Sequence, residues 1–444
     1  MPKLKSFLIS PPVAKAMQAA DQAAPVRIPV IITPRELAHH QGVALAKEKV
    51  KELLTSRGVP FQESDFYVFA RLLPEDIRLL CEKKEYIRRI WRDDTCQTHL
   101  LSSTTTVKAS ACWRTFDARG SGVTWAVLDT GIRSDHPHFQ QYANIDLDLS
   151  RNLSNSPTLE DRNGHGTHVA GIIAGAAKPA EKFPRAATFE EDDDDAVVID
   201  LAGCPSGVAP MAKIVNVKVL DDDGTGAASV AIRGLEYLRK LNQGSQEIKI
   251  HGANLSLGYP FDPKWYGCGQ SPLCEEVNRT VRSGCVVVIS CGNSGYGVTK
   301  LNTGEEVPAC IGLSITDPAN ADLAISVGSV HKQAPHVYGI SYFSSKGPTG
   351  DGRTKPDLVA PGEKVVSCSI QLDKGYEYEE RSGTSMAAPH VSGAIAAFLS
   401  VHSEFRGNPE KIKEIFLRSA MDLGRAEAFQ GAGLVDLMKA MASV

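Results

Sequence analysis

The chain lacks the features that mark membrane, nucleic-acid-binding and secreted proteins. Its 48 lysines and arginines nearly balance 52 acidic residues, for a net charge of −4, so no electrostatic attraction to nucleic-acid phosphates is expected. No apolar run approaches the roughly 18 residues that a membrane-spanning helix needs. The N-terminal segment 1–12 has only a short apolar stretch closely followed by prolines, whereas a secretory signal needs an apolar core of about 7–15 residues. These absences predict a cytoplasmic protein without a membrane or nucleic-acid partner, although secretion by another route stays open.

The cysteines also lack a recognisable pattern. None of the 10 cysteines forms a CxxC motif, which removes the commonest sequence signal for a redox or zinc site. Cys285 precedes the apolar run 286–289, where a buried free thiol is expected. Cys268 and Cys274 flank a short loop and could pair, but a reducing compartment favours free thiols.

Three short segments, far apart in the chain, carry residue types that act together in acyl transfer. Asp129 ends the apolar run 123–129, His165 begins a helix-like run between glycines, and Ser385 lies in a small-residue turn before an alanine-rich run. Backbone N–H groups at the start of a helix are unpaired and lie at the positive end of its dipole. A serine nucleophile needs a base, and the imidazole base needs a carboxylate to orient it. The three residues therefore predict nucleophilic acyl transfer.

At these residues the chain resembles the subtilases, the subtilisin-like serine proteases. The matching blocks are Asp129-Thr130-Gly131, His165-Gly166-Thr167-His168 and Gly383-Thr384-Ser385-Met386-Ala387. The resemblance covers about Val107 to Val435 and, given the compact layout, is greatest to the intracellular bacterial branch. It implies a serine endopeptidase with Asp129, His165 and Ser385 as its catalytic triad. The implied fold is α/β, with a subtilisin-like parallel sheet and helices on both faces.

The resemblance also implies the rest of the active site. Asn293 follows the apolar run 286–290 and matches the family's oxyanion asparagine. Gly224-Thr225-Gly226 and Ser256-Leu257-Gly258 match the two edges between which a polypeptide substrate lies extended and is bound through its backbone. Cleavage is therefore expected to be broad, with a preference for large apolar residues at P1.

Alternating strand and helix patterns divide the chain. Strands are predicted at 26–32, 66–72, 86–91, 214–220, 251–257, 286–290 and 324–330, and helices at 43–54, 75–83, 229–241 and 275–283. The alternation in the second half favours a parallel sheet. Pro29 predicts that the first strand lies at a sheet edge.

The N-terminal pattern resembles the subtilase prodomain, a small α+β ferredoxin-like domain that assists folding and inhibits the enzyme. An unrelated α/β module is the alternative. The predicted organisation is a leader at 1–24, an inhibitory prodomain at 25–96, a linker and processing segment at 97–106, and the catalytic domain at 107–444. A zymogen is expected to cut itself between Cys96 and Thr106.

Other functions fit the residues less well. Gly224-Thr225-Gly226 follows a strand, but a third glycine is missing and Asp221, Asp222 and Asp223 would repel a pyrophosphate. The histidines do not form an H-E-x-x-H zinc motif, and His168 is expected to be a packed helix residue. A catalytically silent subtilase-fold binding or regulatory protein would need neither the triad nor Asn293, so their presence favours an enzyme.

No cofactor is expected to be required, and calcium is possible but not assigned. His138 stands where family members with a first calcium site often carry an acid. The loop that supplies the other ligands is replaced by an insert at about 178–204. The acidic run 190–195 within this insert is predicted to be a solvated loop.

Overall fold

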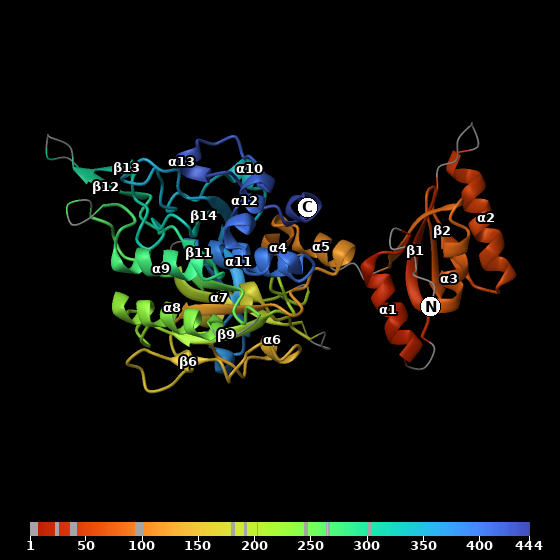
Figure 1. Ribbon diagram of the computed structural model, residues 1–444, viewed down its shortest axis with the longest axis horizontal. Coiled ribbons are helices and arrows are strands. Elements are labelled where there is room, and N and C mark those ends of the chain that lie inside the picture. The colour runs from red at the N-terminus through yellow and green to blue at the C-terminus, as the bar shows by residue number, and fades with distance from the viewer. Residues whose placement is uncertain are drawn as a thin grey trace. The chain divides into compact units, whose positions relative to one another are not determined.

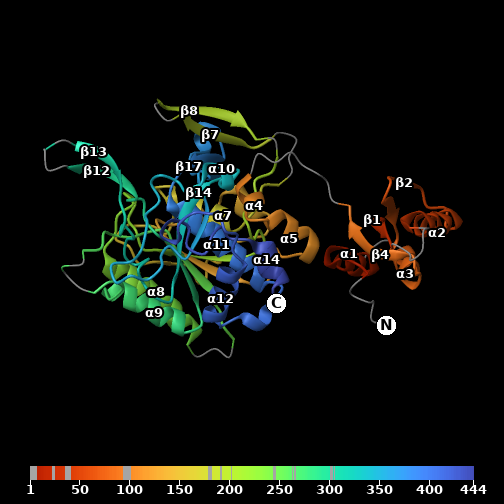
Figure 2. The same cartoon turned by 90° about the horizontal axis from the view of Figure 1, so that it is seen from above.

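The computed structural model describes residues 8–22, 26–35, 42–93, 102–178, 183–190, 193–201, 203–243, 247–262, 264, 267–300, 304 and 306–444. Two compact units divide the chain (Figures 1 and 2). The N-terminal unit comprises Met1–Gln97 and Ala111–Asp117, and the larger unit comprises Thr98–Ser110 and Ala118–Val444. Residues 94–101, which hold most of the predicted processing segment, lie outside the described residues.

The N-terminal unit is a four-stranded antiparallel sheet with helices on one face. The strand order is β2-β3-β1-β4, and the β-α-β-β-α-β sequence of elements is that of ferredoxin-like domains. Its elements are α1 (Pro11–Gln22), β1 (Ile28–Pro34), α2 (Gly42–Ser56), β2 (Phe61–Glu63), β3 (Val68–Leu72), α3 (Pro74–Glu82) and β4 (Ile87–Arg92).

Two expectations for this unit were wrong. Val13 and Met17 of α1 are buried in the same core as Val30, so the expected leader 1–24 contributes a helix to this unit. β1 is central rather than at the edge, although it contains Pro29. The pairing of β1 with β4 begins at Val30, one residue after Pro29. The N–H that proline lacks therefore falls at the start of the strand, where proline is tolerated.

The second face of this sheet carries a row of partly exposed apolar side chains. Ile31 is paired in register with Phe69 on β3 and with Trp91 on β4. The Trp91 indole donates a hydrogen bond to Thr33 Oγ1 at 3.1 Å, and the Arg89 guanidinium lies 4.5 Å from the ring centre.

The larger unit is built on a seven-stranded sheet in which the named strand pairs are all parallel, as predicted. Its strands, in spatial order, are β15 (Leu358–Glu363), β14 (Ile325–His331), β11 (Val286–Ser290), β10 (Gly252–Leu255), β5 (Thr124–Asp129), β9 (Lys213–Lys218) and β6 (Arg151–Asn152). The central strands are buried along their whole length, which explains their continuous apolar sequences.

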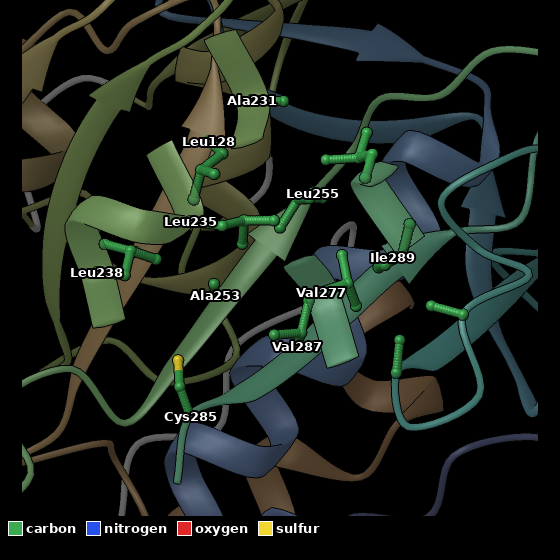
Figure 3. Close-up of a cluster of buried hydrophobic side chains, with 14 of the residues drawn as sticks. Leu128, Ala231, Leu235, Leu238, Ala253, Leu255, Val277, Cys285, Val287 and Ile289 are labelled. Atoms are coloured by element: carbon green, nitrogen blue, oxygen red, sulfur yellow. The ribbon is translucent and has the colours of Figure 1, made fainter. Parts of the chain in front are cut away.

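Helices cover both faces of this sheet. Leu255 of β10 packs with Leu235 of α8 (Ala228–Asn242) and Val277 of α9 (Pro272–Arg282) in one apolar cluster (Figure 3). Its neighbour Asn254 points to the opposite face, since strand side chains alternate, and is bonded to Ser392 of α11 (Thr384–Leu399). Helix α11 also packs against α7 (His165–Ile173) on that face.

The remaining described elements complete the two units, with most of α5 in the N-terminal unit. The helices are α4 (Ser102–Thr106), α5 (Ala109–Phe116), α6 (Pro137–Gln140), α10 (Pro335–Tyr338), α12 (Pro409–Ser419), α13 (Glu427–Gln430), α14 (Leu437–Ala442), η1 (Leu372–Lys374) and η2 (Ser403–Phe405). The strands are β7 (Arg185–Glu190), β8 (Asp193–Asp200), β12 (Tyr296–Lys300), β13 (Glu306–Cys310), β16 (Val365–Cys368) and β17 (Tyr378–Arg381). No helix in the described ranges has the length and apolar character to cross a bilayer.

Two segments expected to be irregular are structured. The end of the expected linker 97–106 forms α4, because Ser103 is buried and Thr106 Oγ1 donates to Lys332 O at 2.7 Å; these contacts outweigh the low helix propensity of Ser and Thr. Within the acidic run 190–195, expected to be a loop, Glu190 ends β7, residues 193–195 begin β8, and Glu190 pairs with Asp193, while 191 and 192 lie outside the described residues. β7 in turn pairs with β17, so a neighbouring strand edge stabilises the extended conformation.

Candidate active site

The fold brings the predicted residues to one cleft. Asp129 is the last residue of β5, His165 the first of α7, and Ser385 lies in the first turn of α11. His165, Ser385 and Asn293 line a cleft of about 600 Å³. Both predicted walls, Gly224–Gly226 and Ser256–Gly258, line the same cleft.

Asp129 and His165 are directly bonded. Asp129 Oδ1 lies 2.7 Å from His165 Nδ1, and the carboxylate is 1% exposed. Because a carboxylate accepts here, Nδ1 carries the proton and Nε2 is left as a base. Burial lowers the pKa of His165, but the charge of Asp129 and its hydrogen bond outweigh burial and raise that pKa above its ordinary value.

One glycine and one missed carboxylate hold His165 in place. A Cβ on Gly166 would collide with the Gly131 carbonyl and crowd Asp129, so glycine lets α7 approach β5. Asp161 is buried and accepts bonds from the N–H groups of Gly164 at 2.8 Å and Thr167 at 2.9 Å. Asp161 therefore caps the helix that begins at His165. The sequence analysis missed it, although an acid a few residues before a helix start is a capping signal.

Ser385 is held through Ser256. Its Oγ donates to Ser256 O at 3.2 Å, rather than to His165, within the described structure. Ser256 Oγ donates back to Ser385 O at 2.9 Å. This carbonyl needs a side-chain donor because Pro389, four residues later in α11, has no N–H. Ser256 thus does more than form a cleft wall.

Asn293 presents its amide N–H groups to the cleft. Its Oδ1 accepts bonds from Thr384 N at 2.9 Å and Thr384 Oγ1 at 3.0 Å. With the oxygen fixed in this way, Nδ2 is directed away from Thr384. The N–H of Ser385 lies in the first turn of α11, where no intrahelical acceptor exists. Two donors are therefore available on the same side of the cleft.

The aspartates before Gly224 have structural partners. Asp222 pairs with the buried Lys218 at 2.6 Å, and Asp223 accepts the N–H and the hydroxyl of Thr225 at 2.9 and 2.8 Å. They shape the turn that forms this wall.

His138 does not fit a calcium site. Its Nε2 faces the carbonyl oxygens of Gly171 at 3.2 Å and Ala174 at 3.0 Å, so it donates to them, and Nδ1 accepts from Tyr378 Oη at 3.1 Å. Burial lowers the pKa of His138 to about 3, so the ring is neutral. Over the described ranges, no group of three or more His, Cys, Asp or Glu side chains could hold a metal ion.

His168 and Cys285 are buried, as predicted. His168 is fully buried, with Nε2 3.1 Å from Glu379 O, and burial lowers its pKa well below the ordinary value. Cys268 and Cys274 are both free thiols.

Comparison with known proteins is consistent with this geometry. The serine protease AprX of Bacillus subtilis is 27% identical over 427 residues, covering 92% of this chain and 87% of that protein. An intracellular serine protease of Paenibacillus polymyxa is 30% identical, covering 74% of this chain and 83% of its own. Subtilisin BL of Lederbergia lenta is 34% identical over 71% of this chain and 90% of its own.

The model of the subtilase family matches residues 120–434, which include all three motif blocks and Asn293. The chain therefore belongs to the subtilase family and is a subtilisin-like serine endopeptidase.

Proposed function

We propose that the chain hydrolyses peptide bonds through an acyl-enzyme formed on Ser385. His165 Nε2 takes the hydroxyl proton as Ser385 Oγ attacks the scissile carbonyl, and then gives that proton to the leaving amine. Asp129 orients His165 and stabilises its charged form. The Nδ2 group of Asn293 and the N–H of Ser385 hold the oxyanion. Water, activated by His165, then releases the acyl group, so the side chains handle every proton without a cofactor.

The observation that carries this proposal is the 2.7 Å bond between Asp129 and His165 at a cleft that Ser385 and Asn293 also line. A fluorophosphonate probe that reacts with activated serines tests it. Wild type should be labelled and should cleave casein, whereas Ser385→Ala should do neither. Ser382→Ala is the matched control, because this exposed serine lies in the same segment and bonds Lys364 N. A wild type that neither labels nor cleaves would favour the silent binding protein.

The substrates we propose are extended polypeptides with large apolar P1 residues. Apolar side chains line part of the cleft, namely Leu220, Ala231, Leu257 and Leu273. The two glycine-containing walls offer mainly backbone groups, which recognise any sequence. A peptide-library profile that requires one charged P1 residue would overturn this proposal.

We also propose that the N-terminal unit is an inhibitory prodomain that the enzyme removes. This unit has its own buried core, and the alignment with AprX extends over 92% of the chain. A tethered processing segment has a high effective concentration at the active site. Because α4 begins at Ser102 and subtilases bind extended chains, we place the cut in the first part of the interval from Cys96 to Thr106.

N-terminal sequencing over time tests the processing. Wild type should acquire a new terminus in this interval, Ser385→Ala should stay intact, and the released unit should inhibit wild type. If wild type stays full-length while it cleaves casein, the N-terminal unit is a permanent structural domain.

We place the protein in the cytoplasm. Two of the similar proteins, from Paenibacillus polymyxa and Bacillus subtilis, are named intracellular serine proteases. Fractionation of the source cells tests the location.

A further inference from the structure

A two-stranded hairpin extends from the larger unit beside the cleft. β12 and β13 pair only with each other among the named strands, and Figures 1 and 2 both show them projecting from the body of this unit. In their register, Tyr296 lies opposite Cys310 and Val298 opposite Pro308. These side chains share one face of the hairpin because strand side chains alternate.

That face is apolar and open near the base of the hairpin, whereas Lys300 and Glu306 lie on the same face at its far described end. Tyr296 is 49% exposed and Val298 65% exposed, and Tyr342 from the following loop is 67% exposed. The rings of Tyr296 and Tyr342 meet edge to face, with centres 5.7 Å apart. On the other face Ile311 lies against Gly297, where a Cβ would be 2.8 Å from Ile311 Cδ1, and Val307 and Ala309 are partly buried. We call Tyr296, Val298, Pro308 and Tyr342 the arm face.

The base of the hairpin is anchored next to the oxyanion asparagine. Asn293 and Ser294 line the cleft, and β12 begins two residues later at Tyr296. Lys346 Nζ is buried and donates to Gly295 O at 2.8 Å and Tyr342 O at 2.9 Å. One lysine therefore fixes both the start of the hairpin and the loop that carries Tyr342.

We propose that the arm face binds an apolar, extended segment of an unfolded polypeptide substrate while another part of the same chain occupies the cleft. This inference rests on the proposed function of the cleft. Exposed apolar side chains gathered on one face are typical of binding surfaces, and rigid tyrosines are typical contact residues.

Two further observations favour this occupant. A two-stranded ribbon has free strand edges, which can add an extended chain by backbone hydrogen bonds. The ion pair of Lys300 and Glu306, 3.9 Å apart, leaves the described end of the ribbon without net charge, so the arm has no charge of one sign that would favour an oppositely charged segment. A substrate chain that binds the arm face and the cleft at the same time has a raised effective concentration at the cleft.

The test compares a long and a short substrate. In Tyr296→Ser/Val298→Ser/Tyr342→Ser, KM for an unfolded casein should rise about tenfold, which corresponds to a loss of about 1.4 kcal/mol shared by the three exposed contact residues. Hydrolysis of a blocked tetrapeptide anilide, too short to reach the arm, should stay unchanged. Val337→Ser/Tyr338→Ser is the matched control, because these residues of α10 are 74% and 66% exposed and should leave both substrates unaffected.

The outcomes are distinct. Equal loss on casein and tetrapeptide would show that the arm supports Asn293 and would overturn the proposal, as would no change on either. A variant that alters sedimentation from dimer to monomer would identify a second copy as the occupant. Val298→Ser alone, at the more exposed of the two substituted hairpin positions, gives a smaller increase of the same kind if the triple variant unfolds. A wild type inactive on the tetrapeptide would count against the proposed function itself.

Discussion

Removing the Ser256 hydroxyl should destabilise the protein, because this hydroxyl makes the hydrogen bond to the Ser385 carbonyl that no backbone N–H of residue 389 can make. Pro389 cannot donate to the carbonyl of Ser385, and Ser256 Oγ does so at 2.9 Å. The same Oγ accepts from Asn254 Nδ2 at 2.9 Å, and Asn254 Oδ1 accepts from Ser392 at 2.9 Å. A continuous polar chain thus links β10 to α11 under the nucleophile.

The magnitude follows from the groups left without partners. Ser256→Ala removes the donor to one buried carbonyl and the acceptor of one amide N–H. Each such group costs about 1–3 kcal/mol, so the free energy of unfolding should fall by about 2–6 kcal/mol in total, with the lower end applying where water reaches these groups.

A double-mutant cycle with Pro389→Ala tests whether the missing N–H of Pro389 is the reason that the Ser256 hydroxyl stabilises the protein. Alanine at 389 restores an N–H that can donate to the Ser385 carbonyl, so Ser256→Ala should cost about 1–2 kcal/mol less in that background. Urea unfolding is measured with Ser385→Ala throughout, which prevents self-digestion and keeps the backbone carbonyl. Ser419→Ala is the control, since this buried hydroxyl bonds Phe416 O at 3.3 Å and should add to Pro389→Ala without coupling. A coupling energy of Ser256 with Pro389 under about 0.5 kcal/mol would refute the reasoning.

The remaining predictions concern catalysis. Asn293→Ala should lower kcat about 100–1000-fold with little change in KM, the magnitude known for the corresponding donor in subtilisin; a raised KM with unchanged kcat would assign it a binding role. Neutral His165 is the base and its pKa is raised, so kcat/KM should increase with pH through a midpoint above the ordinary value of 6.5. Asp129→Asn removes the charge and the charged hydrogen bond that raise the pKa of His165, and leaves the burial that lowers it. A pH–rate profile should therefore show the midpoint below about 6.5 and a much lower kcat. Ser385→Ala and His165→Ala should each abolish casein cleavage, with a double variant no worse than either single one. Asp161→Ala should lower the free energy of unfolding by about 2–4 kcal/mol in urea, because several N–H groups lose their acceptor; a change below about 0.5 kcal/mol would contradict its capping role.

The catalytic sheet could be predicted because buried parallel strands have a simple sequence pattern. The run 286–290 is β11 with the predicted bounds, and the predicted strand 324–330 differs from β14 by one residue at each end. Full burial on both faces demands continuous apolar residues. β15 was missed because Pro361 and Gly362 argue against a strand, yet proline is tolerated there since β15 lies at the sheet edge.

Features that depend on contacts between distant segments could not be predicted. The bond of Ser256 to Ser385 joins residues in separate motifs, and nothing in either motif indicates it. Within the insert, Ala186 and Ala187 of β7 pair with β17, a strand far along the chain, and this tertiary pairing supports an extended conformation that local propensity does not indicate.

The pairing of β7 with β17 also explains how a histidine is held at position 138, where family members with a first calcium site often carry an acid. Its imidazole satisfies the carbonyls of Gly171 and Ala174 and needs Tyr378 as a donor on its other nitrogen. Tyr378 is the first residue of β17 and is paired with Ala186 of β7, so the insert helps to hold the tyrosine against the histidine. The neutral ring thus donates from Nε2 to the loop after α7 and accepts at Nδ1, and protonation would turn Nδ1 into a donor and break its bond from Tyr378. Because the folded-state pKa of His138 is lowered to about 3, the unfolded chain binds more protons than the folded one below about pH 6.5. The stability that this site contributes is complete above about pH 6.5 and falls as the solution becomes more acidic. Acidification should therefore weaken the packing of His138 against the loop after α7.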